Sequence, residues 1–306
     1  MKKIVYFTLS LTIFTLSIFA FIYFNRSESE GLISPFINKS KILGTNLWLP
    51  NINTQASNGL QISAKAAFFI ESKTGQPLFT KNVDQRLPIA SLAKVMTVLI
   101  ALEHKNLNDE FWVSQRAADM EPDKMLLISG EKLTLKELLY GVFLISANDA
   151  AEVLAEETTG DRQEFISLMN TKAQQLGMTN SYFVDPTGLD QDTGSSYSTA
   201  YDLALLTRYV IKQFPQVVEI SKTDHIYLPA TDKHQDYDMY SGINLLTTYD
   251  GVVGFKTGYT PEAGYTLITL ARKGDKEVIG VLLDSQYRRD EAKELLDYSF
   301  KHMKKK

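Results

Sequence analysis

The order of strand-like and helix-like patterns along the chain constrains its fold more than any other feature. Short apolar runs typical of buried strands occur near residue 66 and again after residue 254. Between them, most of 90–215 carries amphipathic helical patterns. Segments from both ends of this region must therefore share one sheet, with a mostly helical insertion between them. The order predicts an α+β domain.

The individual elements follow from periodicity and turn signals. A first hairpin is expected from strand 66–70 through a turn at 72–76 to strand 77–80. We expect helices at 90–104, 134–145, 149–158, 161–176 and 199–214. A glycine follows the fourth helix and a proline follows the fifth. The last third should contain strands at 254–257, 265–271 and 278–283, and a closing helix at 288–302.

Ahead of the domain, residues 4–24 form an uncharged, mostly apolar run that follows Lys2 and Lys3. At ~1.5 Å per residue this run reaches about 31 Å, enough to cross a hydrocarbon core of ~30 Å. The preceding charges favour a cytoplasmic N-terminus. We expect 1–24 to be a transmembrane signal-anchor, 25–59 an extracytoplasmic linker, and 60–306 the domain outside the membrane. A cleaved signal peptide, which would release a secreted protein, stays an alternative.

Composition excludes several kinds of chemistry. The chain has no cysteine, so thiolate catalysis and iron–sulfur ligation are excluded. Its 4 histidines form no H-E-x-x-H pair, so we expect no metal site. The net charge of −4 gives no electrostatic case for a nucleic-acid partner.

Ser91 and Lys94 stand three residues apart at the start of an expected helix, so their side chains share one face. A hydroxyl is a weak nucleophile until a base takes its proton, and an amine that is kept neutral can be that base. The helix start also offers backbone N–H groups to a developing negative charge. An isolated S-x-x-K pair, however, is more typical of a helix-start serine followed by a surface lysine.

Two further motifs follow in order. Ser146 and Asn148 lie at the junction of two expected helices, where side chains can project into a cleft, although both are ordinary capping residues. Lys256–Gly258, a K-T-G, lies on an expected strand, where the lysine offers charge to a carboxylate and the glycine permits close backbone approach. An edge-strand lysine is the ordinary explanation. A second K-T-G at Lys73 is interpreted as a hairpin tip.

Taken together, the three motifs resemble the active-site boxes of serine penicillin-binding proteins and β-lactamases. Over roughly 63–285, the chain is similar to the D-alanyl-D-alanine carboxypeptidases, the low-molecular-weight penicillin-binding proteins. The segments that carry this resemblance are Arg86–Ser91, Ser146–Ala151, Asp185–Leu189, Ser198–Ala204, Lys256–Thr260 and Ala263–Tyr265. It implies a β-lactamase/transpeptidase-like fold: an antiparallel sheet flanked by helices, with a mostly helical subdomain and the active site at their border.

The resemblance also assigns catalytic roles. Ser91 would be the acylated nucleophile and Lys94 its proton acceptor, while Ser146 and Asn148 would shuttle protons and bind the substrate amide. Burial and a second nearby lysine should lower the pKa of Lys94, as a general base requires.

Substrate binding is assigned by the same resemblance to the third box. Lys256 and Thr257 would hold the substrate carboxylate, with Gly258, Tyr259 and Thr260 beside them. The backbone N–H groups of Ser91 and Tyr259 would form the oxyanion hole.

The implied function is that of a serine D,D-carboxypeptidase tethered to the bacterial cell membrane. It would remove the terminal D-alanine from peptidoglycan stem pentapeptides through an acyl-enzyme, without a cofactor, and β-lactams would inhibit it covalently. Three alternatives stay open: a D,D-endopeptidase of the same family, a class A-like β-lactamase, and a non-catalytic wall-binding protein. The β-lactamase needs a further carboxylate, and Glu164 is not in the usual E-x-x-L-N pattern.

The chain also departs from the family pattern. Ser241–Leu246 stands where many members carry an N-x-N stretch, and a basic residue that binds carboxylate there in some members is missing. We also expect the N-terminal anchor to replace the additional β-rich domain and C-terminal anchor of many relatives.

Overall fold

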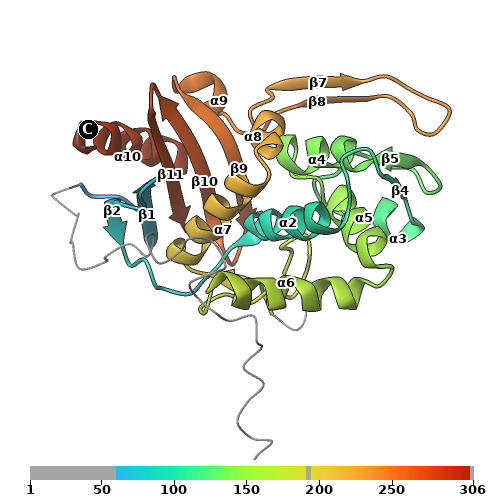
Figure 1. The fold of residues 1–306 in the computed structure, drawn as a ribbon, viewed down its shortest axis with the longest axis horizontal. Helices are drawn as coiled ribbons and strands as arrows, with labels where there is room; N and C mark the ends of the chain where they lie inside the picture. The colour runs from blue at the N-terminus through green and yellow to red at the C-terminus, as the bar shows by residue number, and fades with distance from the viewer. Residues whose placement is uncertain (1–59, 191–193, 304–306) are drawn as a thin grey trace, which may run out of the picture. The chain divides into compact units, whose positions relative to one another are not determined.

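A five-stranded antiparallel sheet, in the order β2-β1-β11-β10-β9, forms the centre of the domain (Figure 1). Its strands are β1 (Ala66–Glu71), β2 (Pro77–Lys81), β9 (Val252–Thr260), β10 (Gly264–Lys273) and β11 (Lys276–Leu283). The computed structural model describes residues 60–190 and 194–303, all of which belong to the compact unit Leu47–Lys306. Because β1 pairs with β11 from Ala66–Leu283 to Glu71–Val278, the sheet joins both ends of the domain, as predicted.

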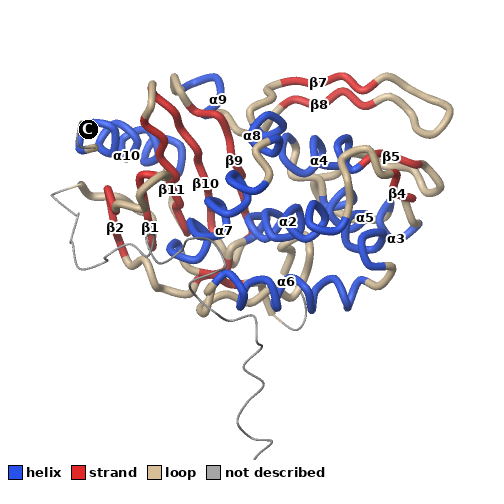
Figure 2. The backbone as a smooth tube through the Cα atoms, in the orientation of Figure 1, coloured by secondary structure: helices blue, strands red, loops and turns tan. Residues whose placement is uncertain are grey.

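Helices cover both faces of the sheet. Helix α10 (Arg288–His302) packs on one face, and α7 (Ala200–Gln213) packs on the other (Figure 2). Strand β1 shows why two layers are needed. Its consecutive residues Phe68 and Phe69 are both fully buried, but their side chains point to opposite faces and belong to two different apolar clusters. A strand buried on both sides reads as a continuous apolar run.

The helical part of the domain lies beyond the β9 edge of the sheet. It contains α2 (Lys94–His104), α4 (Leu135–Leu144), α5 (Asn148–Thr159) and α6 (Arg162–Leu176). Thr134 and Glu137 form the capping box at the start of α4, with each side chain accepting from the other residue's backbone. Glycines at 160 and 177 end α5 and α6 in the left-handed conformation. The predicted α+β architecture is confirmed.

Several short elements were not predicted. The chain forms a short helix α3 (Gln115–Ala118) and two further helices, α8 (Gln216–Ser221) and α9 (Leu245–Thr248). Within the described residues, three small ladders also form: β3 (Leu87–Pro88) with β6 (Tyr197–Ser198), β4 (Glu110–Trp112) with β5 (Lys132–Thr134), and β7 (His225–Leu228) with β8 (Tyr237–Tyr240). The loop of the last hairpin docks on the β4–β5 region, where Lys132 N donates to Lys233 O over 3.1 Å.

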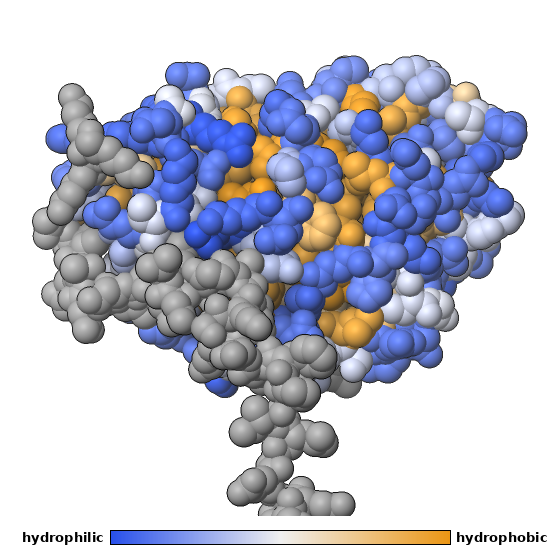
Figure 3. All heavy atoms as spheres, in the orientation of Figure 1, coloured by the Kyte–Doolittle hydropathy of each residue, from blue (hydrophilic) through white to orange (hydrophobic). Residues whose placement is uncertain are grey.

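The predicted signal-anchor at 1–24 and linker at 25–59 lie outside the described residues. Among the residues that the structure describes, no helix has the length and apolarity needed to cross a bilayer. Hydrophilic side chains cover most of the face drawn in Figure 3, and hydrophobic residues show through near its middle.

Candidate active site

Ser91 lies in a 3₁₀ turn, η2 (Ala90–Ala93), that leads directly into α2. The sequence predicted one continuous helix from residue 90, so the first turn is tighter than expected. Ala90 has a positive φ of 50°, an uncommon conformation for a residue with a side chain. Gly188 packs against it so closely that a Cβ at 188 would stand 2.0 Å from Ala90 O. The backbone ahead of Ser91 is therefore held by its neighbours.

Lys94 is fully buried at the start of α2, and three oxygen atoms surround its amine. Lys94 Nζ lies 2.9 Å from Ser91 Oγ, 2.6 Å from Asn148 Oδ1 and 2.7 Å from Thr187 O. The structure thus brings the first two predicted boxes together. It adds the Thr187 carbonyl, to which no role had been assigned.

The chemistry of these three oxygens differs. Thr187 O is a carbonyl oxygen and can only accept hydrogen bonds. Asn148 Oδ1 likewise only accepts, and the orientation of its amide is set by Asn148 Nδ2, which donates to Pro122 O over 2.6 Å. A neutral amine has two N–H groups and one lone pair. If its two N–H groups donate to these carbonyl oxygens, the lone pair faces the Ser91 hydroxyl. The arrangement suits proton transfer from Ser91 to Lys94.

The pKa of Lys94 is lowered to about 7, chiefly because burial disfavours the ammonium. The negative charges of Asp185, Asp123 and Asp149 oppose this shift. The predicted direction is confirmed. Repulsion between the two lysines acts mainly on Lys256. Burial is the largest cause that lowers the pKa of Lys256, and the charge of Lys94 is the second.

Lys256, on β9, is also fully buried and reaches the second box. Its Nζ donates to Ser146 Oγ over 2.8 Å and to Thr257 O over 2.7 Å. Ser146 lies between α4 and α5 with a positive φ of 61°, which is again unusual for a residue other than glycine. Ser146 and Asn148 therefore stand at a helix junction, as predicted, and they reach different lysines.

The remaining residues of the third box differ in their surroundings. A Cβ at Gly258 would stand 2.6 Å from Thr266 Oγ1 and 3.0 Å from Ser91 N, so β9 passes directly beside the Ser91 amide and leaves little room for a side chain. Thr257 is partly buried and Tyr259 is exposed. Thr260 is buried, and its hydroxyl accepts from Ala263 N over 3.1 Å, so it closes the β9–β10 turn.

Arg288, at the start of α10, was missed by sequence reasoning. Its Nη1 donates to Gly258 O over 2.7 Å and to Thr266 O over 3.2 Å. Together with Thr257 and Asn244, it lines a cavity of about 230 Å³. The Arg288 guanidinium therefore places a positive charge near Thr257, although residues 241–246 lack the basic residue found there in some family members. The one local hint was an arginine in the first turn of a helix, where the macrodipole disfavours it.

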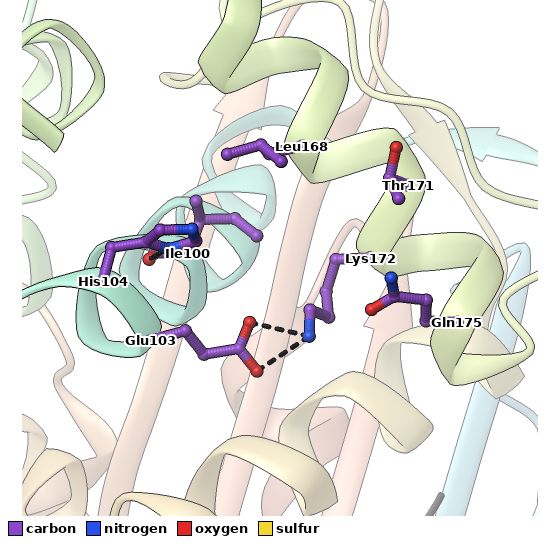
Figure 4. A pocket seen from close by; sticks show the side chains of 7 residues that line it. All are labelled: Ile100, Glu103, His104, Leu168, Thr171, Lys172 and Gln175. Atoms are coloured by element: carbon purple, nitrogen blue, oxygen red, sulfur yellow. Dashed lines mark hydrogen bonds and ion pairs between the residues drawn. The ribbon is translucent and has the colours of Figure 1, made fainter. Parts of the chain in front are cut away.

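A larger hollow than the cavity at Arg288 lies away from these residues. It measures about 500 Å³ between α2 and α6, and none of the predicted site residues lines it (Figure 4). Its charged groups Glu103 and Lys172 pair with each other at 2.7 Å. No cluster of potential metal ligands occurs among residues 60–190 and 194–303.

Comparison with known proteins points to one family. The model of the D-alanyl-D-alanine carboxypeptidase family matches residues 52–287. A D-alanyl-D-alanine carboxypeptidase of Bacillus subtilis is 36% identical over 246 residues, which cover 78% of this chain and 62% of that protein. A Streptomyces enzyme of the same name is 33% identical over 257 residues, covering 78% of this chain and 88% of that one. The chain thus spans less than two thirds of the Bacillus relative.

Solved structures agree. The DD-transpeptidase of Streptomyces K15 superposes with a TM-score of 0.74 at 30% identity, covering 80% of this chain and all of that chain. A putative penicillin-binding protein homologue from Mycobacterium tuberculosis gives a TM-score of 0.75 at 28% identity, covering 83% and 98%. The range 52–287 that matches the family model contains the positions of all three boxes.

Proposed function

This chain belongs to the D-alanyl-D-alanine carboxypeptidase family, and we propose that it removes the terminal D-alanine from peptidoglycan stem peptides through an acyl-enzyme on Ser91. One observation carries the proposal. The buried Lys94 amine lies 2.9 Å from Ser91 Oγ, and two carbonyl oxygens occupy its other hydrogen-bonding directions. The lowered pKa of Lys94 then leaves a large share of the amine neutral at pH 7.

The reaction begins with acylation. Ser91 Oγ attacks the carbonyl carbon of the penultimate D-alanine while its proton passes to Lys94 Nζ. The oxyanion accepts hydrogen bonds from the backbone N–H groups of Ser91 and Tyr259. The C–N bond then breaks, and the leaving D-alanine amine takes up a proton. Water then attacks the ester carbonyl carbon and the bond from this carbon to Ser91 Oγ breaks. The shortened peptide leaves with a carboxylate, and Oγ takes a proton from the water to restore the hydroxyl.

Substrate binding uses the other two boxes. Lys256 and Thr257 hold the terminal carboxylate, and Arg288 adds positive charge beside them. Burial lowers the pKa of Lys256, whereas the negative charge of a bound carboxylate would favour the protonated amine. Ser146, 2.8 Å from Lys256 Nζ, is placed to relay a proton to the leaving amine.

The domain organisation belongs to the same proposal. Residues 1–24 anchor the chain in the bacterial cell membrane, 25–59 link the anchor to the domain, and 60–306 carry out catalysis outside the cytoplasm. The length and apolarity of 4–24 support this arrangement.

Mass spectrometry after treatment with benzylpenicillin tests the proposed reaction. We expect one covalent adduct, located on the peptide that contains Ser91 and absent from Ser91→Ala. An intact chain without any adduct, or an adduct elsewhere, would contradict the proposal. Rapid loss of the adduct with turnover of the drug would indicate a β-lactamase instead. Glu164, the nearest sequence candidate for its extra carboxylate, is exposed at the start of α6.

A pentapeptide monomer and a crosslinked dimer then separate the two peptidase activities. Faster release of D-alanine from the monomer supports a carboxypeptidase. Faster cleavage of the dimer would support an endopeptidase.

A further inference from the structure

Arg162, the first residue of α6, joins two buried carboxylates that the mechanism above does not use. Its Nε donates to Glu152 Oε1 over 2.6 Å, and its Nη2 donates to Asp185 Oδ2. The Glu152 and Asp185 side chains are 0% and 1% exposed. Buried carboxylates are costly unless they are paired, so this guanidinium has a specific task in the fold.

Asp185 connects Arg162 to the site through a tight turn. Its other oxygen, Oδ1, accepts from Thr187 N over 2.7 Å, from Gly188 N over 3.0 Å and from the Thr187 hydroxyl. Thr97 Oγ1, on α2, donates to Pro186 O over 2.6 Å and ties the same turn to the helix of Lys94. The turn therefore has a defined position relative to α2.

Two residues of this turn contact the site: Thr187 contacts Lys94, and Gly188 contacts the backbone that precedes Ser91. Thr187 O accepts from Lys94 Nζ over 2.7 Å, and Gly188 packs on the carbonyl of Ala90, next to Ser91. A shift of the turn would change the partner that orients the Lys94 amine. Arg162 itself touches neither Ser91 nor Lys94 by any hydrogen bond or ion pair described here.

Charge points to the same link. The acidic groups that favour a charged Lys94 are Asp185 first, then Asp123 in the loop between α3 and β5, and Asp149 on α5. The opposing cation is Lys256 on β9. The Arg162 guanidinium lies directly against Asp185 and offsets its charge. Without Arg162, Asp185 would attract a proton to Lys94 more strongly.

We propose that Arg162 is a positioning residue for the serine–lysine pair: it clamps Asp185 so that the Thr187 carbonyl stays against Lys94 and the Asp185 charge is matched by a guanidinium. This inference rests on the proposed acylation of Ser91. The proposed role of Arg162 is to keep Lys94 neutral and correctly oriented, and it adds no group that reacts with the substrate.

The test measures the rate of acylation by a fluorescent penicillin between pH 5 and 9 on the full chain. In Arg162→Gln, we expect the acid limb of the rate profile to move to higher pH by about one unit, because the unmatched Asp185 raises the pKa of Lys94. Near pH 6 the variant should therefore react about tenfold more slowly than the parent. At high pH, where Lys94 is neutral in both proteins, the variant should still react more slowly than the parent, because the Thr187 carbonyl no longer orients the amine.

Two further variants separate positioning from general loss of structure. Arg162→Gln combined with Asp185→Asn removes both charges, and we expect it to restore the parental midpoint. Arg116→Gln is the matched control, because Arg116 pairs with Glu152 at 3.0 Å and with Glu156 at 3.7 Å. Its profile should stay at the parental midpoint.

The outcomes are distinguishable. An unlabelled parent protein would overturn the proposed function itself. A labelled parent with an unmoved midpoint in Arg162→Gln, or an equal shift in Arg116→Gln, would overturn the role of Arg162 alone. If Arg162→Gln fails to fold, Arg162→Lys carries the test. Lysine keeps the charge without the guanidinium fork, so a smaller shift in the same direction is expected and an unmoved midpoint contradicts the proposal.

Discussion

Where α10 covers the sheet, the buried side chains are mostly apolar, whereas beyond the β9 edge the protein buries two lysines together with Asn148 and Asp185. The first region is stabilised in proportion to the apolar area removed from water. In the second, burial disfavours each lysine ammonium, and the structure supplies oxygen partners at 2.6 to 2.9 Å. Apolar burial stabilises both regions, but in the second it also lowers the pKa of two amines.

The largest effect that separates the two regions should come from Lys94→Met. Methionine fills similar space but cannot accept a proton, so acylation by penicillin should fall by about 10³-fold. A fluorescent penicillin and gel densitometry measure this rate, and thermal unfolding serves as the control for folding. Acylation at more than a tenth of the parental rate would show that Lys94 is not the base.

Leu295→Ala should produce the reverse pattern. Leu295, on α10, is fully buried in the apolar cluster, so its truncation should lower the free energy of unfolding by about 3 kcal/mol. Urea denaturation measures the loss. The folded variant should be acylated at the parental rate, because Leu295 lies about two helical turns beyond Arg288. The apolar cluster that contains Leu295 includes neither Ser91 nor Lys94. Strong loss of acylation in fully folded protein would show that the two regions are coupled.

The dependence of acylation on pH is a smaller effect. In the proposed mechanism only neutral Lys94 accepts the Ser91 proton, so the rate should rise with pH, be half-maximal near the pKa of about 7, and level off above it. Between pH 5 and 6 this amounts to about tenfold per unit. Stopped-flow measurements with a β-lactam whose own charge is constant over this range provide the profile. A rate that is flat from pH 5 to 8 would contradict a titrating base.

The smallest effect is expected at the second K-T-G. Lys73–Gly75 has the same sequence as Lys256–Gly258 but forms the tip of the β1–β2 hairpin, where Lys73 Nζ donates to Asp275 O at the surface. Lys73→Ala should leave acylation unchanged and alter the free energy of unfolding by less than about 1 kcal/mol. Lys256→Ala is the comparison and should impair binding of carboxylate substrates. Equal losses in both variants would mean that the motif alone, without its burial, decides the effect.

How much the sequence revealed differs between the same two regions. The sheet, α10 and most helices were predicted, because periodicity and caps are local signals. The three boxes were found because each is a short motif with a family meaning. Strand bounds were approximate: β9 begins at Val252, before the predicted residue 254, and runs to Thr260.

The contacts that complete the site could not be predicted in this way. Thr187, Arg162 and Arg288 act through pairs separated by 93, 23 and 30 residues, and no local pattern links the partners. The segment Asp185–Leu189 was recognised by resemblance, yet its carbonyl contact with Lys94 depends on the fold. Long-range hydrogen bonds leave no periodic trace in a single sequence.

The protonation state of Lys94 in the folded protein tests the whole account most directly. Carbon-13 labelling of lysine Cε, with the signal assigned by its loss in Lys94→Arg, allows the amine to be titrated by nuclear magnetic resonance. We predict a midpoint near pH 7, in line with the lowered pKa of the buried amine. A midpoint near 10.5, the ordinary lysine value, would leave Ser91 without a base and contradict the proposed mechanism.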